Sequence, residues 1–169
     1  MPNTFTKIAS VTVGSGGSSS ITFSSIPSTY TDLCLKVSLR SNASRINEDL
    51  LVSFNGSTSS RSWRFLEGNG SSASSASGTD GRFSTFNADT STANTFGNAE
   101  LYIPNYAGSN YKSVSIDTVT ENNATSAYAE IEAALWANTA AISSITCTLA
   151  FGTLFMQYST ATLYGISKS

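Results

Sequence analysis

Histidine is absent from this sequence of 169 residues. Its absence excludes the Ser-His-Asp and Cys-His arrangements of nucleophilic enzymes, the commonest general base and most zinc sites. Cysteine is nearly absent, because only Cys34 and Cys147 occur, and two cysteines are too few for a disulfide framework. The alternating pattern places these two on different strand faces, so we expect separate thiols rather than a disulfide.

Charged side chains are also scarce. They make up 12% of the residues, with 9 Lys and Arg against 11 Asp and Glu, and the net charge is −2. No basic patch is available to neutralise phosphates, which argues against nucleic acid as a partner. No apolar run approaches the roughly 20 residues that span a bilayer, and residues 1–4 lack the basic and apolar regions of a signal peptide. We expect a soluble protein made in the cytoplasm, with no membrane partner and no cofactor.

Short alternating segments, separated by Gly, Asn and Ser turns, fill most of the chain. The clearest half-buried strand is Tyr30–Leu39, in which every second residue from Leu33 onwards is apolar. Nine or ten such strands, without a sustained helical period, predict an all-β protein. The length is typical of one domain. We therefore predict a single domain, residues 1–169, folded as a two-sheet antiparallel β-sandwich that is jelly-roll-like.

Turn residues predict three hairpins, because glycine and asparagine readily adopt the positive φ of tight reversals. They pair residues 5–13 with 20–23, residues 50–54 with 61–66, and residues 99–103 with 112–117. The segment 68–81 is instead rich in Gly and Ser and has almost no apolar side chain. It cannot offset the entropy of its own ordering by burial, so we predict a loop there that is either mobile or held by a partner.

The segment Ser126–Asn138 is ambiguous, because its Ala, Glu and Leu favour a helix while its alternation favours a strand. We predict a strand. Glu130 and Glu132 would then share one face, as a glycosidase acid and base sometimes do. The favoured interpretation is a solvated outer face opposite Ile131 and Ala133.

Four other acidic residues have both a structural and a metal-binding interpretation. Glu48 and Asp49 read as the end of a loop rather than a metal site. Asp80 and Asp89 flank polar loops and could bind Ca²⁺, but the Asp-x-Asp-x-Asp spacing is missing. We therefore predict no metal site and no catalytic residues.

Aromatic residues remain as candidates for recognition, since flat amphipathic side chains suit both sugar stacking and protein interfaces. Trp136 and Tyr102 lie in predicted strands, where packing is the simpler interpretation. Tyr106, Asn110 and Tyr111 lie in or beside the loop between the strands 99–103 and 112–117. We predict that these three residues contact a partner protein or a glycan.

Three segments resemble a family of small virion structural proteins of tailed bacteriophages, especially phages of aquatic bacteria. They are IASVTVGSGG at residues 8–17, TFGNAELYIPNYAG at residues 95–108 and YSTATLYGI at residues 158–166. The similarity extends over nearly the whole chain. It implies a component of the phage particle, and it supplies no catalytic residues.

The resemblance and the composition together lead to one expectation and one alternative. The expected function is that of a non-enzymatic virion protein, a capsid decoration or cement subunit on the particle surface that contacts the major capsid protein. The alternative is a receptor- or carbohydrate-binding module of a tail or head fibre, which contacts tail components or a host-surface glycan. Low charge and abundant strand edges also predict a homo-oligomer.

Overall fold

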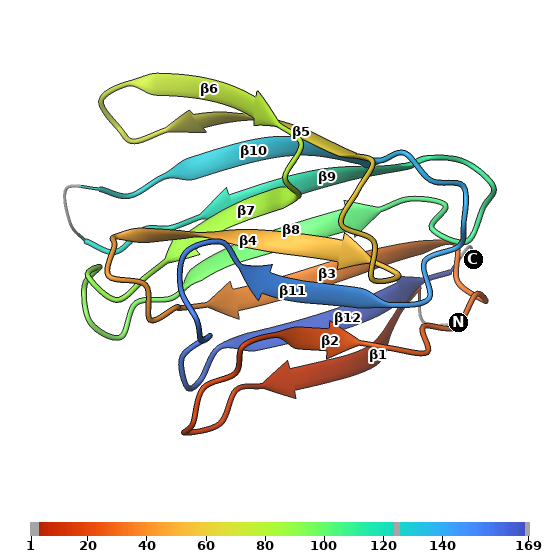
Figure 1. Ribbon diagram of the computed structural model, residues 1–169, viewed down its shortest axis with the longest axis horizontal. Coiled ribbons are helices and arrows are strands. Elements are labelled where there is room, and N and C mark those ends of the chain that lie inside the picture. The colour runs from red at the N-terminus through yellow and green to blue at the C-terminus, as the bar shows by residue number, and fades with distance from the viewer. Residues whose placement is uncertain (1–3, 124–125, 168–169) are drawn as a thin grey trace.

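The computed structural model describes residues 4–123 and 126–167, in which twelve strands form two antiparallel sheets packed face to face (Figure 1). The larger sheet contains, in spatial order, β1 (Phe5–Thr12), β12 (Thr160–Ile166), β3 (Asp32–Leu39), β8 (Gly97–Ile103), β9 (Lys112–Val119), β10 (Ala129–Trp136), β5 (Arg61–Gly68) and β6 (Ala73–Gly78). The smaller sheet contains β2 (Ile21–Phe23), β11 (Ile145–Leu149), β4 (Asn47–Phe54) and β7 (Arg82–Asn87). The all-β sandwich is thus confirmed, with somewhat more strands than predicted. Residues 1–3, used above to argue against a signal peptide, lie outside the described residues.

The strand order is that of a jelly roll. Four pairs, β1 with β12, β2 with β11, β3 with β8 and β4 with β7, would form one long hairpin of eight strands if the chain were unrolled. Rolling that hairpin up adds the contacts of β12 with β3 and of β11 with β4, which gives two sheets of four strands. The remaining strands enter as two insertions, β5-β6 and β9-β10, and both extend the larger sheet.

Of the three predicted hairpins, only one is confirmed. β8 and β9 pair antiparallel and flank the loop that the sequence indicates. The other two hairpins are wrong, because consecutive strands of a jelly roll alternate between the sheets: β1 and β2 lie in different sheets, as do β4 and β5. Asn55 and Gly56 do make a tight turn, with φ of 53° and 71°, but the chain then crosses to the other sheet.

The predicted loop at residues 68–81 is wrong in its central part, because it contains the strand β6. This strand pairs with β5 from Trp63 opposite Gly78 to Gly68 opposite Ala73. Five of its six residues are exposed. Backbone hydrogen bonds to β5 therefore order this segment, although its side chains bury little surface. Composition alone does not reveal such pairing.

Apolar side chains from both sheets fill the space between them. The four predicted inward residues of β3 are all buried, and Leu33, Leu35 and Leu39 are completely so. Phe54 of the smaller sheet lies 5.7 Å from Phe83 and 5.6 Å from Trp136, measured between ring centroids. These contacts connect the smaller sheet to the insertion strand β10.

The two cysteines are separate buried thiols, as predicted. Burial raises the pKa of Cys34 to about 11 and that of Cys147 to about 12. Both thiols therefore stay protonated at neutral pH, and since the thiolate is the nucleophile, neither is activated.

Candidate functional site

The loop between β8 and β9 lies at the end of the sandwich that also carries the chain termini (Figure 1). Tyr106, predicted to contact a partner, is completely buried. Its hydroxyl donates a hydrogen bond to the Pro27 carbonyl, and its own carbonyl accepts one from the Ile142 N–H at 3.0 Å. Asn105 has a φ of 49°, which turns the chain so that the next ring enters the core. The prediction for Tyr106 is therefore wrong: this residue anchors the loop.

Lys112 fixes the same loop from its other end. It is completely buried, and its Nζ donates hydrogen bonds to the carbonyls of Gly108 at 2.8 Å and of Asn110. Burial lowers the pKa of this amine. The loop is thus held by a buried cation at one end and a buried aromatic ring at the other, which leaves little freedom for rearrangement.

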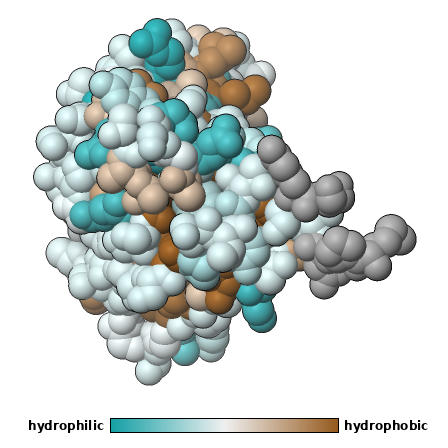
Figure 2. Space-filling view, turned by 90° about the vertical axis from the view of Figure 1, so that its right-hand side faces the viewer, coloured by the Kyte–Doolittle hydropathy of each residue, from teal (hydrophilic) through white to brown (hydrophobic). Residues whose placement is uncertain are grey.

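Asn110 and Tyr111 do lie at the surface. Tyr111 is 57% exposed, and the Asn110 side chain donates to the Tyr111 carbonyl at 2.8 Å. Figure 2 shows this end of the molecule, where pale residues of near-neutral hydropathy predominate, with hydrophilic (teal) and hydrophobic (brown) residues between them. These two predicted residues are therefore accessible, on a loop that the buried Tyr106 and Lys112 anchor.

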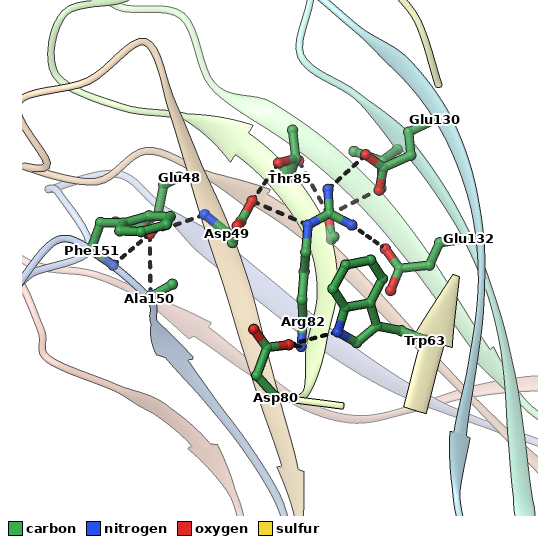
Figure 3. A network of polar contacts seen from close by, with 12 residues as sticks. Glu48, Asp49, Trp63, Asp80, Arg82, Thr85, Glu130, Glu132, Ala150 and Phe151 are labelled. Carbon is green, nitrogen blue, oxygen red and sulfur yellow. Dashed lines mark hydrogen bonds and ion pairs between the residues drawn. The ribbon is translucent and has the colours of Figure 1, made fainter. Parts of the chain in front are cut away.

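A buried ionic cluster lies between β7 and the insertion strand β10, and the sequence interpretation missed it (Figure 3). Arg82 donates from Nη2 to Glu130 and from Nη1 to Glu132, both at 2.8 Å, and its Nε lies 3.2 Å from Asp49. Glu130 and Glu132 are each only 2% exposed, whereas Ile131 is 70% exposed. The predicted faces of this strand are therefore reversed. Arg82, distant in sequence, makes the inward position of the acids possible.

Protonation of Glu132 reduces the negative charge of this cluster. Burial raises the pKa of Glu132 to about 9. Arg82 offsets only part of this rise, and Glu130 adds to it. Its Oε2 accepts from Arg82, while its Oε1 has no hydrogen-bond partner among the described residues. For Arg82, burial alone would lower the pKa, but Glu130 and the other carboxylates outweigh it and raise it.

The cluster has the chemistry of a structural ion-pair network. Two carboxyl groups on one strand face could serve as acid and base in glycoside hydrolysis, but these two lie between the sheets with an arginine against both. A substrate could reach them only if β7 moved away from β10.

Glu48 is a third buried acid, and the loop end predicted for Glu48 and Asp49 is wrong because both lie in β4. The Glu48 side chain is completely buried. It accepts hydrogen bonds from the backbone N–H groups of Asp49, Ala150, Phe151 and Gly152, at 3.0, 3.2, 3.0 and 2.6 Å. Its role is thus to hold the segment after β11 against β4.

Asp80, considered for calcium, accepts from Trp63 Nε1 at 2.6 Å and from the Arg82 backbone N–H at 3.3 Å. Asp89 lies beside Arg40, which donates to the Asp89 backbone carbonyl at 3.0 Å. Across residues 4–123 and 126–167, no group of three or more His, Cys, Asp or Glu side chains is arranged to hold a metal ion. Asp80 instead orients the ring of Trp63.

The outer face of the larger sheet carries the most exposed apolar side chains of the insertion strands. Leu66 on β5 and Ile131 on β10 are directly paired and are 59% and 70% exposed. Together with the neighbouring exposed Ala133 they form what we call the outer patch. Two shallow depressions, of about 700 and 490 Å³, are both lined by Leu66 and Ile131.

Polar side chains surround the outer patch. One row runs in register across six strands and reads Ser75, Leu66, Ile131, Asp117, Glu100 and Lys36. The last two form an exposed ion pair of 2.7 Å. A contiguous apolar area with a polar rim is typical of an interaction surface. The alternation in β10 is the sequence signal for this surface, but the prediction placed Ile131 and Ala133 on the inner face of the strand.

Comparison with family models, curated proteins and solved structures yields no match to this chain. No helix in the described part of the chain combines the length and apolar character that crossing a membrane requires. Function must therefore be argued from the surfaces described above.

Proposed function

We propose that this protein is a non-enzymatic component of a tailed-bacteriophage virion, a capsid decoration or cement subunit that docks on the shell. The observation that carries the docking part is the outer patch, where Leu66 and Ile131 lie exposed side by side near the β6 edge of a broad sheet face. Burying such side chains against a partner is favourable by roughly 25 cal/mol per Å². The phage setting rests on the resemblance of residues 8–17, 95–108 and 158–166.

Two further features support a docking role. The chain carries a net charge of only −2, so little electrostatic repulsion opposes dense arrangement of copies on a surface. The jelly-roll sandwich also presents its larger sheet as a wide face, and sheets of this architecture recur in capsid proteins and lectins. Fold alone does not assign the function, so the proposal depends on the patch.

Copy number on intact particles tests this proposal. Cryo-EM or quantitative proteomics of virions should find copies in a fixed ratio to the major capsid protein. A few copies confined to the tail would contradict the decoration role. A variant with Leu66→Asp and Ile131→Asp should be lost from particles, whereas Thr12→Asp, an exposed position on the opposite edge strand β1, should be retained.

The second candidate function is glycan or receptor binding by a fibre module. It is favoured by the rigid presentation of Tyr111 and Asn110, because a preorganised aromatic side chain loses little entropy on binding. Glycan-array binding by the isolated protein, abolished by Tyr111→Ala and weakened by Asn110→Ala, would support it. Array binding that survives both substitutions would exclude this loop as the site.

The absence of enzymatic activity stays a prediction. Its critical residues are Glu130 and Glu132, the two carboxyl groups on one strand face that were considered above as an acid and a base. If a glycan-cleaving activity were found, the variants Glu130→Gln and Glu132→Gln would decide whether these residues cause it. Unchanged turnover in both variants would remove them from consideration.

A further inference from the structure

We propose that two copies of this protein join edge to edge through β6, antiparallel about a two-fold axis, so that their larger sheets become one continuous sheet. The pairing itself does not depend on the virion role. A strand at a sheet edge presents unpaired N–H and C=O groups, and proteins normally protect such edges. The four edges of this sandwich are β1 and β6 in the larger sheet, and β2 and β7 in the smaller.

Three of these edges carry recognisable protection. β1 has the exposed charge of Lys7 and a bulge between Lys7 and Ala9. β2 is only three residues long, and all six residues of β7 are buried. Charge, bulges, shortness and coverage are the usual devices against edge pairing.

β6 has none of these devices. Its six residues, Ala73 to Gly78, include no charge, no proline and no side chain larger than serine, and its pairing with β5 is regular throughout. Backbone groups that are not bonded to β5 therefore face outwards with nothing beside them to obstruct another strand. Small side chains allow a second backbone to approach to the usual strand spacing of about 4.8 Å.

A second copy of the chain fits this edge better than a charged partner would. Two-fold symmetry makes the pairing antiparallel, and equal residue numbers must then face each other at the axis. The longest overlap centres on Ser75 or Ala76. The nearest charged side chains, Arg64 and Glu67, lie one strand back on β5. They would be separated from those of the second copy by three strand spacings, about 14 Å, beyond the Debye length of about 8–10 Å.

The joined sheet would combine the two outer patches. In the register centred on Ser75, one row would run from Ile131 through Leu66 and Ser75 to the same three residues of the second copy in reverse order. Both apolar pairs would then lie on one face. If the proposed function holds, this doubled face is the one that meets the shell, and avidity would strengthen a weak individual contact.

Solution mass tests the pairing directly. Sedimentation or light scattering of the intact protein, from micromolar to the highest attainable concentration, should show the mass rise towards that of a dimer. The double variant Ser75→Lys, Ser77→Lys should remain monomeric, because it places like charges opposite each other at the axis. Thr12→Lys, on the protected edge β1, should dimerise like the wild type. A wild type that stays monomeric throughout, or a lysine variant that dimerises normally, would overturn the proposal.

Cross-linking provides a second readout that does not depend on affinity. Ser75→Cys and Ala76→Cys, examined separately under mild oxidation, should give a disulfide-linked dimer in at least one case, since the facing Cα atoms would lie within disulfide reach. Cys34 and Cys147 are buried and should not react. Thr12→Cys should stay monomeric. Absence of a dimer from both β6 variants would overturn the pairing.

Particle binding separates this inference from the proposed function. A monomeric lysine variant that still decorates virions at full copy number would leave the pairing intact in solution but remove it from the docking mechanism. A wild type that dimerises and never binds particles would overturn the decoration role and leave the pairing standing.

Discussion

The two halves of the larger sheet are attached to the smaller one in different ways. The half formed by β1, β12, β3 and β8 packs leucines such as Leu35 and Leu101 against the smaller sheet. The half built from the insertions also packs apolar side chains such as Trp136 against the smaller sheet. In addition it holds β7 through Arg82, which pairs with three carboxyl groups. Arg82 also lies over Phe65, with its Cζ 4.4 Å from the ring centroid.

The two attachments differ in how strongly each depends on the identity of particular residues. An apolar half tolerates many sequences as long as volume and pattern are kept. A buried charge cluster tolerates few, because removing one member leaves the others without compensation. The insertions are thus attached by contacts that depend on particular residues.

The largest expected effect comes from removing the central cation. Arg82→Ala leaves the buried Glu130 and the half-buried Asp49 without a counter-charge, so we expect the free energy of unfolding to fall by about 4 kcal/mol. Urea denaturation measures it. Arg64→Ala, an exposed arginine on β5, should change stability by no more than about 0.5 kcal/mol. Similar values for both variants would mean that the cluster does not hold the insertions.

A core truncation in the other half should cost slightly less. Leu35→Ala removes a completely buried side chain and should destabilise by about 3 kcal/mol, within the usual range for such a change. The loss of unfolding free energy should be the same at pH 5 and pH 9, because the substitution removes no contact with a titratable group. A pH-dependent loss of stability in this variant would contradict the proposed difference between the two halves.

The pH dependence of stability should come from the ionic half. The pKa of Glu132 is raised from 4.5 to about 9 in the folded state, so the native protein retains a proton that the unfolded chain releases. The resulting contribution is fully present below pH 4.5 and is lost as the pH rises towards 9. Glu132→Gln, which imitates the protonated group, should flatten this decline, so that the variant becomes progressively more stable than the wild type as the pH rises above 4.5. An unchanged pH profile would contradict the assignment of the proton.

The smallest effect on stability is expected at the outer patch. Leu66→Ser with Ile131→Ser should alter the unfolding free energy by about 0.5 kcal/mol or less, because both side chains are mostly solvated already. The same double variant should lose particle binding. A large loss of stability would show that the patch is part of the folded core rather than a docking surface.

Local patterns predicted the strands better than their partners. The alternation of β8, β9, β10 and β12 identified each as a strand, because period-two burial is a local property. Asn55 and Gly56 correctly marked a reversal, but a turn signal cannot say which sheet the next strand joins. β6 was missed because serine and alanine become a strand there only through pairing with β5.

The candidate site was predicted only in part, for a related reason. Tyr111 and Asn110 are accessible as expected, yet Tyr106 is buried, since one positive φ at Asn105 redirects the chain. Which face of β10 points inwards is decided by Arg82, 48 residues before Glu130. The local sequence does not distinguish a glutamate that points into the core from one that points into solvent. Only the position of its partner does.

Pairing of the first and last strands has a practical consequence for the molecule. Phe5 lies directly opposite Ile166, so both ends of the described chain emerge from one end of the sandwich (Figure 1). A short linker between them should allow circular permutation, with new termini opened in an exposed turn at the far end. Peptides fused before β1 or after β12 would be displayed in the same direction, away from loops such as the Gly14–Gly17 turn at the opposite end.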